Sequence, residues 1–221
     1  MAEQLGIVFT GGEGPKPEVI KRIMEQGTGS RGIRPLLVAA DSGLLLAEEA
    51  GYRPDFVIGD MDSLDSEKRL QSYPADCVIR HSPEKDFTDT ELALALLRDK
   101  GCIETWLVGG GGGRLAHLFG IREMFEGEYY PERWVTAADD IYCICAGGSF
   151  KQEVETGAVV SVFLLGSGPW EAASTGLKWS LNNLNWKRGM TGLSNIATTG
   201  KIDINIKQGR LLIVLEDMWR Q

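Results

Sequence analysis

Two short motifs supply four aspartates, the clearest candidates for chemistry in this sequence. Asp60 and Asp62 lie in the segment Gly-Asp-Met-Asp-Ser at 59–63, and Asp86 and Asp89 lie in Lys-Asp-Phe-Thr-Asp at 85–89. Carboxylates gathered in one place repel one another unless a cation shares the site. Mg²⁺ prefers such oxygen ligands and is usually held by one or two carboxylates plus substrate phosphates. The two motifs together therefore predict a site for Mg²⁺ and a nucleotide.

Each aspartate motif also has an ordinary explanation. Asp is a common turn residue, which would account for Asp60 and Asp62. Asp89 falls in the first turn of a predicted helix, where the helix dipole favours negative charge, and Asp86 would then be a simple loop residue. The metal hypothesis thus depends on the two motifs meeting in space.

A run of five glycines, 109–113, followed by Arg114, is the second chemical feature. It is not a Walker loop, because Arg114 stands in place of the lysine and no Ser or Thr follows. The run does lie between a predicted strand and a predicted helix, where glycine amides and a helix N-terminus favour an anion. Arg114 adds a bidentate donor for phosphate. The alternative is a flexible loop.

The elements that must position these residues alternate between strands and helices over the first two-thirds of the chain. Strands are predicted at 5–9, 36–40, 55–59, 77–80 and 105–108, and helices at 18–25, 44–50, 88–99 and 114–125. Thr88 and Glu91 predict a capping box at the start of the 88–99 helix. This alternation predicts a parallel sheet with helices on both faces. Ligands of such sheets bind outside the carboxyl ends of the strands. Five segments follow those ends and should form one rim: 11–14, 41–43, 59–63, 85–89 and 109–114.

The pattern changes after the first two-thirds, where short strand-like runs replace helical periods. The runs are 141–145, 159–165, 177–179, 202–206 and 211–215. Ile202, Ile204 and Ile206 alternate with polar residues, which is typical of a strand with one buried face. The prediction is an α/β fold: a Rossmann-like, mostly parallel sheet with helices on both faces over residues 1–147. A small all-β sandwich follows over 148–221.

Composition limits the possible partners. The chain has 221 residues and a net charge of −8, whereas nucleic-acid binders usually carry a basic footprint. Apolar runs such as 36–40 are too short to span a bilayer, and the first residues lack the features of a signal peptide. The four cysteines match no zinc-ligand spacing. We therefore expect a cytoplasmic protein with free thiols that binds neither nucleic acid nor membrane.

Taken together and in order, the motifs resemble those of the thiamine pyrophosphokinase (thiamine diphosphokinase) family. The matching segments are 40–43, 54–63, 82–89, 109–117, 175–181 and 192–195. The resemblance implies transfer of pyrophosphate from ATP to thiamine, giving thiamine diphosphate and AMP. It also implies a homodimer, with thiamine bound between the α/β domain of one subunit and the β-sandwich of the other.

The resemblance also assigns roles to individual residues. It implies that the catalytic set is Asp60, Asp62, Asp86 and Asp89, with Asp60, Asp62 and Asp89 as ligands of Mg²⁺. It places Asp41, Lys85, Gly111, Gly112, Gly113 and Arg114 around the nucleotide. In the second domain it implies that Trp179 stacks on the thiamine pyrimidine, with Ser194 and Asn195 nearby.

Two positions depart from the family pattern. Ser42 replaces a glycine and should be tolerated if its φ is negative. Ala116 replaces an aspartate, so any charge or hydrogen bond supplied by that side chain is lost. Two alternative functions follow: a catalytically weakened protein that binds thiamine or a nucleotide, or a pyrophosphokinase for another small alcohol such as a pterin.

Overall fold

The computed structural model describes residues 4–29, 32–61 and 67–219, which form two compact units, 1–137 and 138–221. The division falls earlier than the boundary at 147 expected from the sequence. The reason is that strand β7 (Asp140–Cys145) pairs antiparallel with β13 (Arg210–Leu215) and so belongs to the second unit. Across the described ranges, no helix has the length and apolar character needed to cross a membrane.

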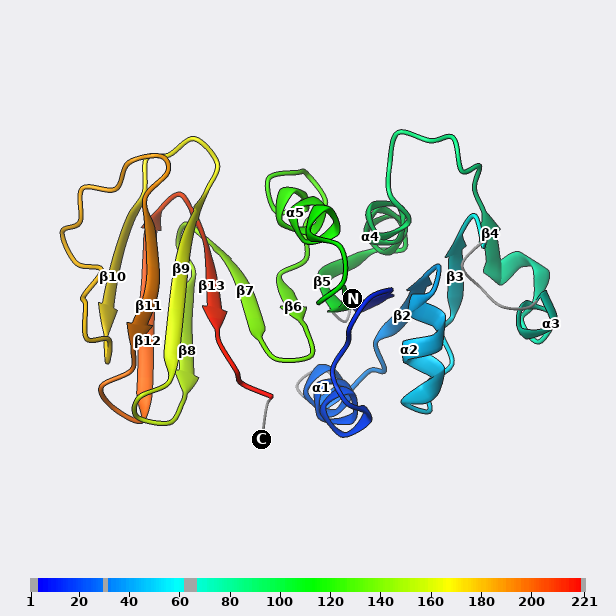
Figure 1. The fold of residues 1–221 in the computed structure, drawn as a ribbon, viewed down its shortest axis with the longest axis horizontal. Helices are drawn as coiled ribbons and strands as arrows, with labels where there is room; N and C mark the ends of the chain where they lie inside the picture. Colours follow the sequence, from blue (N-terminus) through cyan, green and yellow to red (C-terminus); the bar gives the residue numbers. More distant parts are fainter. Residues whose placement is uncertain (1–3, 30–31, 62–66, 220–221) are drawn as a thin grey trace. The chain divides into compact units, whose positions relative to one another are not determined.

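The first unit is a parallel sheet with helices on both faces, which confirms the predicted fold class. Its strands run in the order β6-β5-β1-β2-β3-β4, and every neighbouring pair is parallel. Helices α1 and α2 lie on one face of this sheet, and α4 and α5 lie on the other (Figure 1). The strands are β1 (Gln4–Thr10), β2 (Leu36–Ala40), β3 (Phe56–Gly59), β4 (Val78–Arg80), β5 (Cys102–Gly109) and β6 (Arg133–Val135). The helices are α1 (Pro17–Gly29), α2 (Gly43–Glu49), α3 (Glu67–Leu70), α4 (Asp89–Asp99) and α5 (Leu115–Met124), with a 3₁₀ turn at Ala75–Cys77.

Local sequence explains why these elements begin where they do. Strands β1 and β2 are almost wholly buried apolar runs, as expected when helices cover both faces of a sheet. Helix α4 begins with the predicted capping box. The Thr88 hydroxyl accepts a hydrogen bond from the Glu91 amide at 3.2 Å, and the Glu91 carboxylate accepts one from the Thr88 amide at 2.8 Å. This cap fixes Asp89 as the first residue of the helix.

The second unit is the predicted β-sandwich. One of its sheets has the order β11-β9-β13-β7 and the other has the order β10-β12-β8. Ile202, Ile204 and Ile206 of β12 are buried against β9 and β13 in one apolar core, so the predicted alternation is confirmed. The remaining strands are β8 (Ser149–Glu153), β9 (Val159–Leu165), β10 (Glu171–Thr175), β11 (Thr191–Ile196) and β12 (Lys201–Gln208).

The prediction of a strand at 177–179 is wrong. Leu177 makes only an isolated bridge to Ala197, and the paired strand nearby is β10. Gly176, at φ 80°, turns the chain before residue 177 and so ends the ladder. Strands β6, β8, β10 and β11 were not predicted. They are short or polar, and β8 buries only the side chain of Phe150.

Replacing Gly43 with alanine should destabilise the first unit. A Cβ atom at this first residue of α2 would overlap the carbonyl oxygen of Phe9 and lie 2.7 Å from the Cα atom of Thr10. Overpacking of this kind typically costs about 1–3 kcal/mol in the free energy of unfolding. The matched control is Gly29→Ala, since a Cβ atom at Gly29 meets nothing within 4 Å. Urea unfolding of both variants measures the difference; equal stabilities would contradict this packing of α2 on β1.

Candidate functional site

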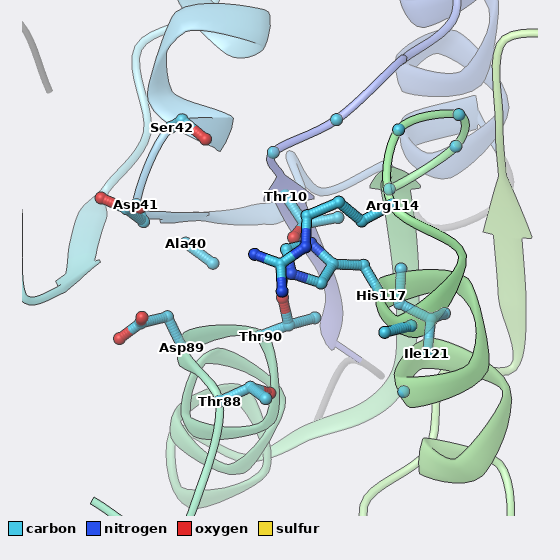
Figure 2. Close-up of a pocket in the computed structure, with 18 of the residues that line it drawn as sticks. Thr10, Ala40, Asp41, Ser42, Thr88, Asp89, Thr90, Arg114, His117 and Ile121 are labelled. Carbon is cyan, nitrogen blue, oxygen red and sulfur yellow. The ribbon is translucent and has the colours of Figure 1, made fainter. Parts of the chain in front are cut away.

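A cavity of about 410 Å³ lies at the carboxyl ends of β1, β2 and β5 in the first unit (Figure 2). Parallel α/β sheets bind ligands at this edge, and here β1 and β5 also lie on either side of the point where the strand order reverses. The wall is formed by Thr10, Gly11, Gly12, Ala40, Asp41, Ser42, Thr88, Asp89, Thr90, Gly110, Gly111, Gly112, Gly113, Arg114, Ala116, His117, Gly120, Ile121 and Met124. Four of the five segments predicted to share a rim therefore contribute to one cavity.

The glycine-rich loops after β1 and β5 are joined by backbone hydrogen bonds. The Gly110 amide donates to the Gly11 carbonyl at 3.0 Å, and Glu13 and Gly111 exchange amide-to-carbonyl bonds of 2.7 and 2.9 Å. A Cβ atom at Gly12 would lie 2.8 Å from the Gly111 carbonyl oxygen, so only glycine allows this approach. The joined loops hold the N-terminus of α5 at the cavity, with Arg114 as its N-cap residue.

Two of the predicted acidic residues meet on the other side of the cavity, beside Gly59. A Cβ atom at Gly59 would lie 3.3 Å from the Asp41 Cβ atom and 3.3 Å from the Asp89 carboxylate. Gly59 also has a φ of 151°, which side chains rarely tolerate. Figure 2 shows Asp41 and Asp89 on one side of the cavity and Arg114 and His117 toward the other. The cavity thus has an acidic side and a side rich in hydrogen-bond donors.

Lys85 forms an ion pair with Asp89. Its ammonium group lies 2.8 Å from the carboxylate oxygen Oδ1, and the side chains of Lys85 and Asp89 are only 16% and 20% exposed. A pair this sheltered is screened less by solvent than a surface pair. Lys85 therefore places a positive charge in contact with one of the two carboxylates on the acidic side of the cavity.

Both departures from the family pattern lie on the cavity wall. Ser42 has a φ of −61°, so the condition for its replacing a glycine is met. Ala116 and His117 are exposed residues in the first turn of α5. The methyl group of Ala116 leaves the donor-rich side of the cavity without the carboxylate that the family pattern would place there.

The other predicted catalytic aspartates are placed differently. Asp60 is half-buried directly after β3 and is not among the wall residues, and Asp86 is exposed in the loop before α4. Asp62 lies outside the described residues. Within 4–29, 32–61 and 67–219, no group of three or more His, Cys, Asp or Glu side chains has a metal-binding arrangement. Asp41 and Asp89 nonetheless fit the donor set of Mg²⁺, which takes one or two protein carboxylates and fills its remaining positions with substrate phosphates and water.

The predicted thiamine residues gather on the second unit. The buried side chain of Asn195 accepts a hydrogen bond from the Trp179 amide at 3.0 Å and donates one to the Trp179 carbonyl at 2.6 Å. Trp179 is 53% exposed, and the Lys178 ammonium group lies 4.6 Å from the centroid of its ring. Ser194 is exposed and has a φ of 54°. Asn195 is thus a brace for Trp179, which presents an aromatic surface to solvent.

Thr10 and Thr90 were not predicted as site residues from the sequence. Both line the cavity, and their hydroxyl oxygens lie 2.7 Å apart. Thr10 had a usable signal, because it directly follows the apolar run 5–9 at a strand end. Thr90 had none, because an uncharged helix residue between Asp89 and Glu91 carries no pattern of its own.

The fold and the cavity define an α/β nucleotide-binding class of enzyme with an appended β-sandwich. Two family models match the chain: "Thiamin pyrophosphokinase, catalytic domain" over residues 33–127 and "Thiamin pyrophosphokinase, vitamin B1 binding domain" over 149–211. The chain therefore belongs to the thiamine pyrophosphokinase family, which confirms the resemblance of its motifs.

Individual relatives agree with this membership. A thiamine pyrophosphokinase of Bacillus subtilis is 26% identical over 199 residues, which cover 88% of this chain and 93% of that protein. The solved thiamin pyrophosphokinase from Geobacillus thermodenitrificans superposes with a TM-score of 0.71 at 25% identity, covering 96% of each chain. A solved structure of thiamine pyrophosphokinase from Bacillus subtilis gives a TM-score of 0.74 at 24% identity, over 97% of this chain and 99% of that one, and supports the fold.

Replacing Asn195 with alanine should destabilise the second unit and release Trp179. The variant leaves the amide and carbonyl groups of Trp179 without their side-chain partner, a loss of about 1–3 kcal/mol in the free energy of unfolding. Asn205→Ala is the matched control, because Asn205 is an exposed residue whose side chain donates to another side chain, that of Asp203, and braces no backbone group among the described residues. Urea unfolding compares the two. A control variant as unstable as Asn195→Ala would contradict the bracing role.

Proposed function

We propose that this chain transfers pyrophosphate from ATP to the hydroxyethyl oxygen of thiamine and releases thiamine diphosphate and AMP. One observation carries the proposal: the cavity at the strand ends combines joined glycine loops and Arg114 with Asp41 and Asp89. Phosphoryl transfer asks little covalent chemistry of a protein, which mainly positions the reactants and stabilises charge. A site with both donors and carboxylates suits that task.

The donor-rich side of the cavity is proposed to hold the phosphate tail of ATP. The N-terminus of α5 carries a partial positive charge and unpaired amide groups, which favour an anion. Gly111, Gly112 and Gly113 let the backbone approach the phosphate oxygens closely, and Arg114 offers a planar fork of donors. In the reaction, the thiamine oxygen forms a bond to the β-phosphorus while the bond from that phosphorus to the oxygen of AMP breaks.

The acidic side is proposed to hold Mg²⁺. Asp89, on the cavity wall, is proposed as a ligand together with Asp60, which directly follows Gly59, and Asp62. Asp41 lines the wall on the same side as Asp89. When bound, the ion neutralises charge on the phosphates. Lys85 contacts Asp89 directly, and its ammonium group would offer a positive charge to the phosphates. Asp86, exposed in the same loop, is assigned no direct contact.

Thiamine is proposed to stack on the indole of Trp179. The exposed ring is a flat apolar surface, and its π-face attracts the cationic thiazolium as well as the neutral pyrimidine. Ser194 directly precedes Asn195, whose side chain bonds the backbone of Trp179. The Ser194 hydroxyl group is proposed to bond a polar atom of thiamine, while Asn195 acts through Trp179.

One reaction mixture tests the proposed function. Purified protein is incubated with ATP and Mg²⁺, with and without thiamine, and AMP and thiamine diphosphate are separated by chromatography. We expect AMP to form only with thiamine, in equal amounts with thiamine diphosphate. Tight thiamine binding without AMP would favour the weakened binding protein, for which Ala116 on the cavity wall is the supporting observation. AMP formation with a pterin alcohol in place of thiamine would favour the other alternative.

Neutralising the acidic side should abolish turnover and leave the fold intact. Asp89→Asn and Asp60→Asn each remove a carboxylate charge and keep the side-chain shape, so we expect kcat to fall at least about 100-fold, which corresponds to roughly 3 kcal/mol. Asp203→Asn, on the central strand β12 of the second unit, is the control. Wild-type kcat in Asp89→Asn and Asp60→Asn would contradict the assignment of this side to Mg²⁺.

The protein is proposed to act as a homodimer in the cytoplasm. Leu115 and Phe119, one turn apart on α5, are each 62% exposed, and the N-terminus of the same helix borders the cavity. Two exposed apolar side chains adjacent on one helix face offer an apolar surface that a second chain could cover, which supports the proposed dimer.

Light scattering after size-exclusion chromatography tests the dimer. The wild-type protein should have twice the mass of one chain. The double variant Leu115→Glu with Phe119→Glu should have the mass of a monomer and should form less AMP. Ile103→Glu is the control, because Ile103 is similarly exposed, at 54%, on β5. A wild-type monomer would contradict the proposal.

A further inference from the structure

Two buried hydroxyl groups meet on the wall of the cavity. Thr10 ends β1 and Thr90 lies in the first turn of α4, and their oxygens are 2.7 Å apart although the residues are 80 positions apart in the chain. Thr10 is 7% exposed and Thr90 is 8% exposed, yet both line the cavity (Figure 2).

The Thr10–Thr90 pair has two hydroxyl protons, and the hydrogen bond between the two groups uses only one of them. Each hydroxyl group carries one proton to donate and two lone pairs to accept. Whichever threonine donates to the other, the acceptor keeps its own proton, and the structure gives neither hydroxyl a second hydrogen-bond partner among the described residues. Leaving a buried donor unused is costly. The pair therefore has one hydroxyl proton available to donate to an acceptor bound in the cavity.

The neighbouring residues indicate what the acceptor is. A Cβ atom at Gly110 would lie 3.1 Å from the Thr10 methyl carbon, and the amide of Gly110 bonds the carbonyl of Gly11, the residue after Thr10. The hydroxyl pair is thus directly beside the glycine loops. Hydrogen bonds from a hydroxyl group to an anionic oxygen are short and about twice as strong as neutral ones.

We propose that the Thr10–Thr90 pair donates its spare proton in a hydrogen bond to an anionic oxygen of the bound polyphosphate. This inference rests on the proposed function for its ligand, and it assigns a phosphate-binding role to two residues outside the charged and glycine motifs. The pair also ties the end of β1 to α4, so that the donor is fixed before the ligand arrives and little rotamer freedom is lost on binding.

The competing explanation is that the pair only joins β1 to α4. The double variant Thr10→Val with Thr90→Val separates the two explanations. It replaces both partners with apolar groups of the same shape, a change that is nearly neutral for stability. Thr10→Ser with Thr90→Ser is the matched control, since it keeps both hydroxyl groups.

Isothermal titration calorimetry with inorganic tripolyphosphate and Mg²⁺ is the measurement, with thermal unfolding of each variant alongside. We expect the valine variant to keep its melting temperature and to bind tripolyphosphate about tenfold more weakly or worse, as for loss of a hydrogen bond to a charged group. The serine variant should bind within about threefold of wild type. ATP should show the same loss, because the contact is to the phosphate tail.

An unchanged Kd for tripolyphosphate in the valine variant overturns the inference, as does a wild-type protein that does not bind tripolyphosphate. If the double variant fails to fold, the single variants Thr10→Val and Thr90→Val replace it in the titration. We expect at least one of them to bind tripolyphosphate more weakly than wild type. A wild-type Kd in both single variants overturns the inference. The thiamine-dependent AMP assay separates the two claims. If AMP forms but the valine variant binds tripolyphosphate as tightly as wild type, only the inference is wrong. If the valine variant binds tripolyphosphate more weakly but the wild-type protein forms no AMP, only the proposed function is wrong.

Discussion

The close approach of two backbone loops at the strand ends is the constraint on which the site depends. Side chains would keep these loops apart. Glycine at positions 12 and 111 lets amide and carbonyl groups bond directly across the point where the strand order reverses. The same absence of a side chain at Gly59 lets Asp41 and Asp89 both lie beside it, on one side of the cavity. Glycines thus bring the donor-rich side and the acidic side close enough to serve one polyphosphate.

Most of the fold could be predicted because its elements have strong local signals. Strand β2 has the predicted bounds, since an uninterrupted apolar run is what a strand buried on both faces requires. Helix α4 begins where its capping box places it. Edge strands lack such signals: β8 buries one side chain and β11 contains Gly192, so their pairing is decided by neighbours that are distant in the chain. The error at 177–179 has the same origin, because an apolar–polar alternation does not reveal the turn at Gly176.

The site was predictable to the extent that it lies at strand ends. Placing Asp41, Asp89 and Arg114 on one rim required only the βα alternation and the rule that ligands bind at carboxyl ends. The hydroxyl pair of Thr10 and Thr90 could not be foreseen, because its geometry arises from packing α4 against the sheet. The same holds for Asn195, whose buried amide braces Trp179, whereas the family resemblance implied only that it lies near thiamine. Chemistry-bearing residue types are visible in a sequence, but their supporting contacts come from tertiary structure.

Hydrogen–deuterium exchange with and without Mg²⁺ and ATP tests most directly whether the joined glycine loops hold the polyphosphate. Amide groups that donate to phosphate oxygens exchange more slowly. We expect slower exchange in peptides that cover residues 10–14 and 109–117, and unchanged exchange in peptides from strands β8 and β12 of the second unit. Unchanged exchange in both loops at saturating nucleotide would contradict this role of the loops.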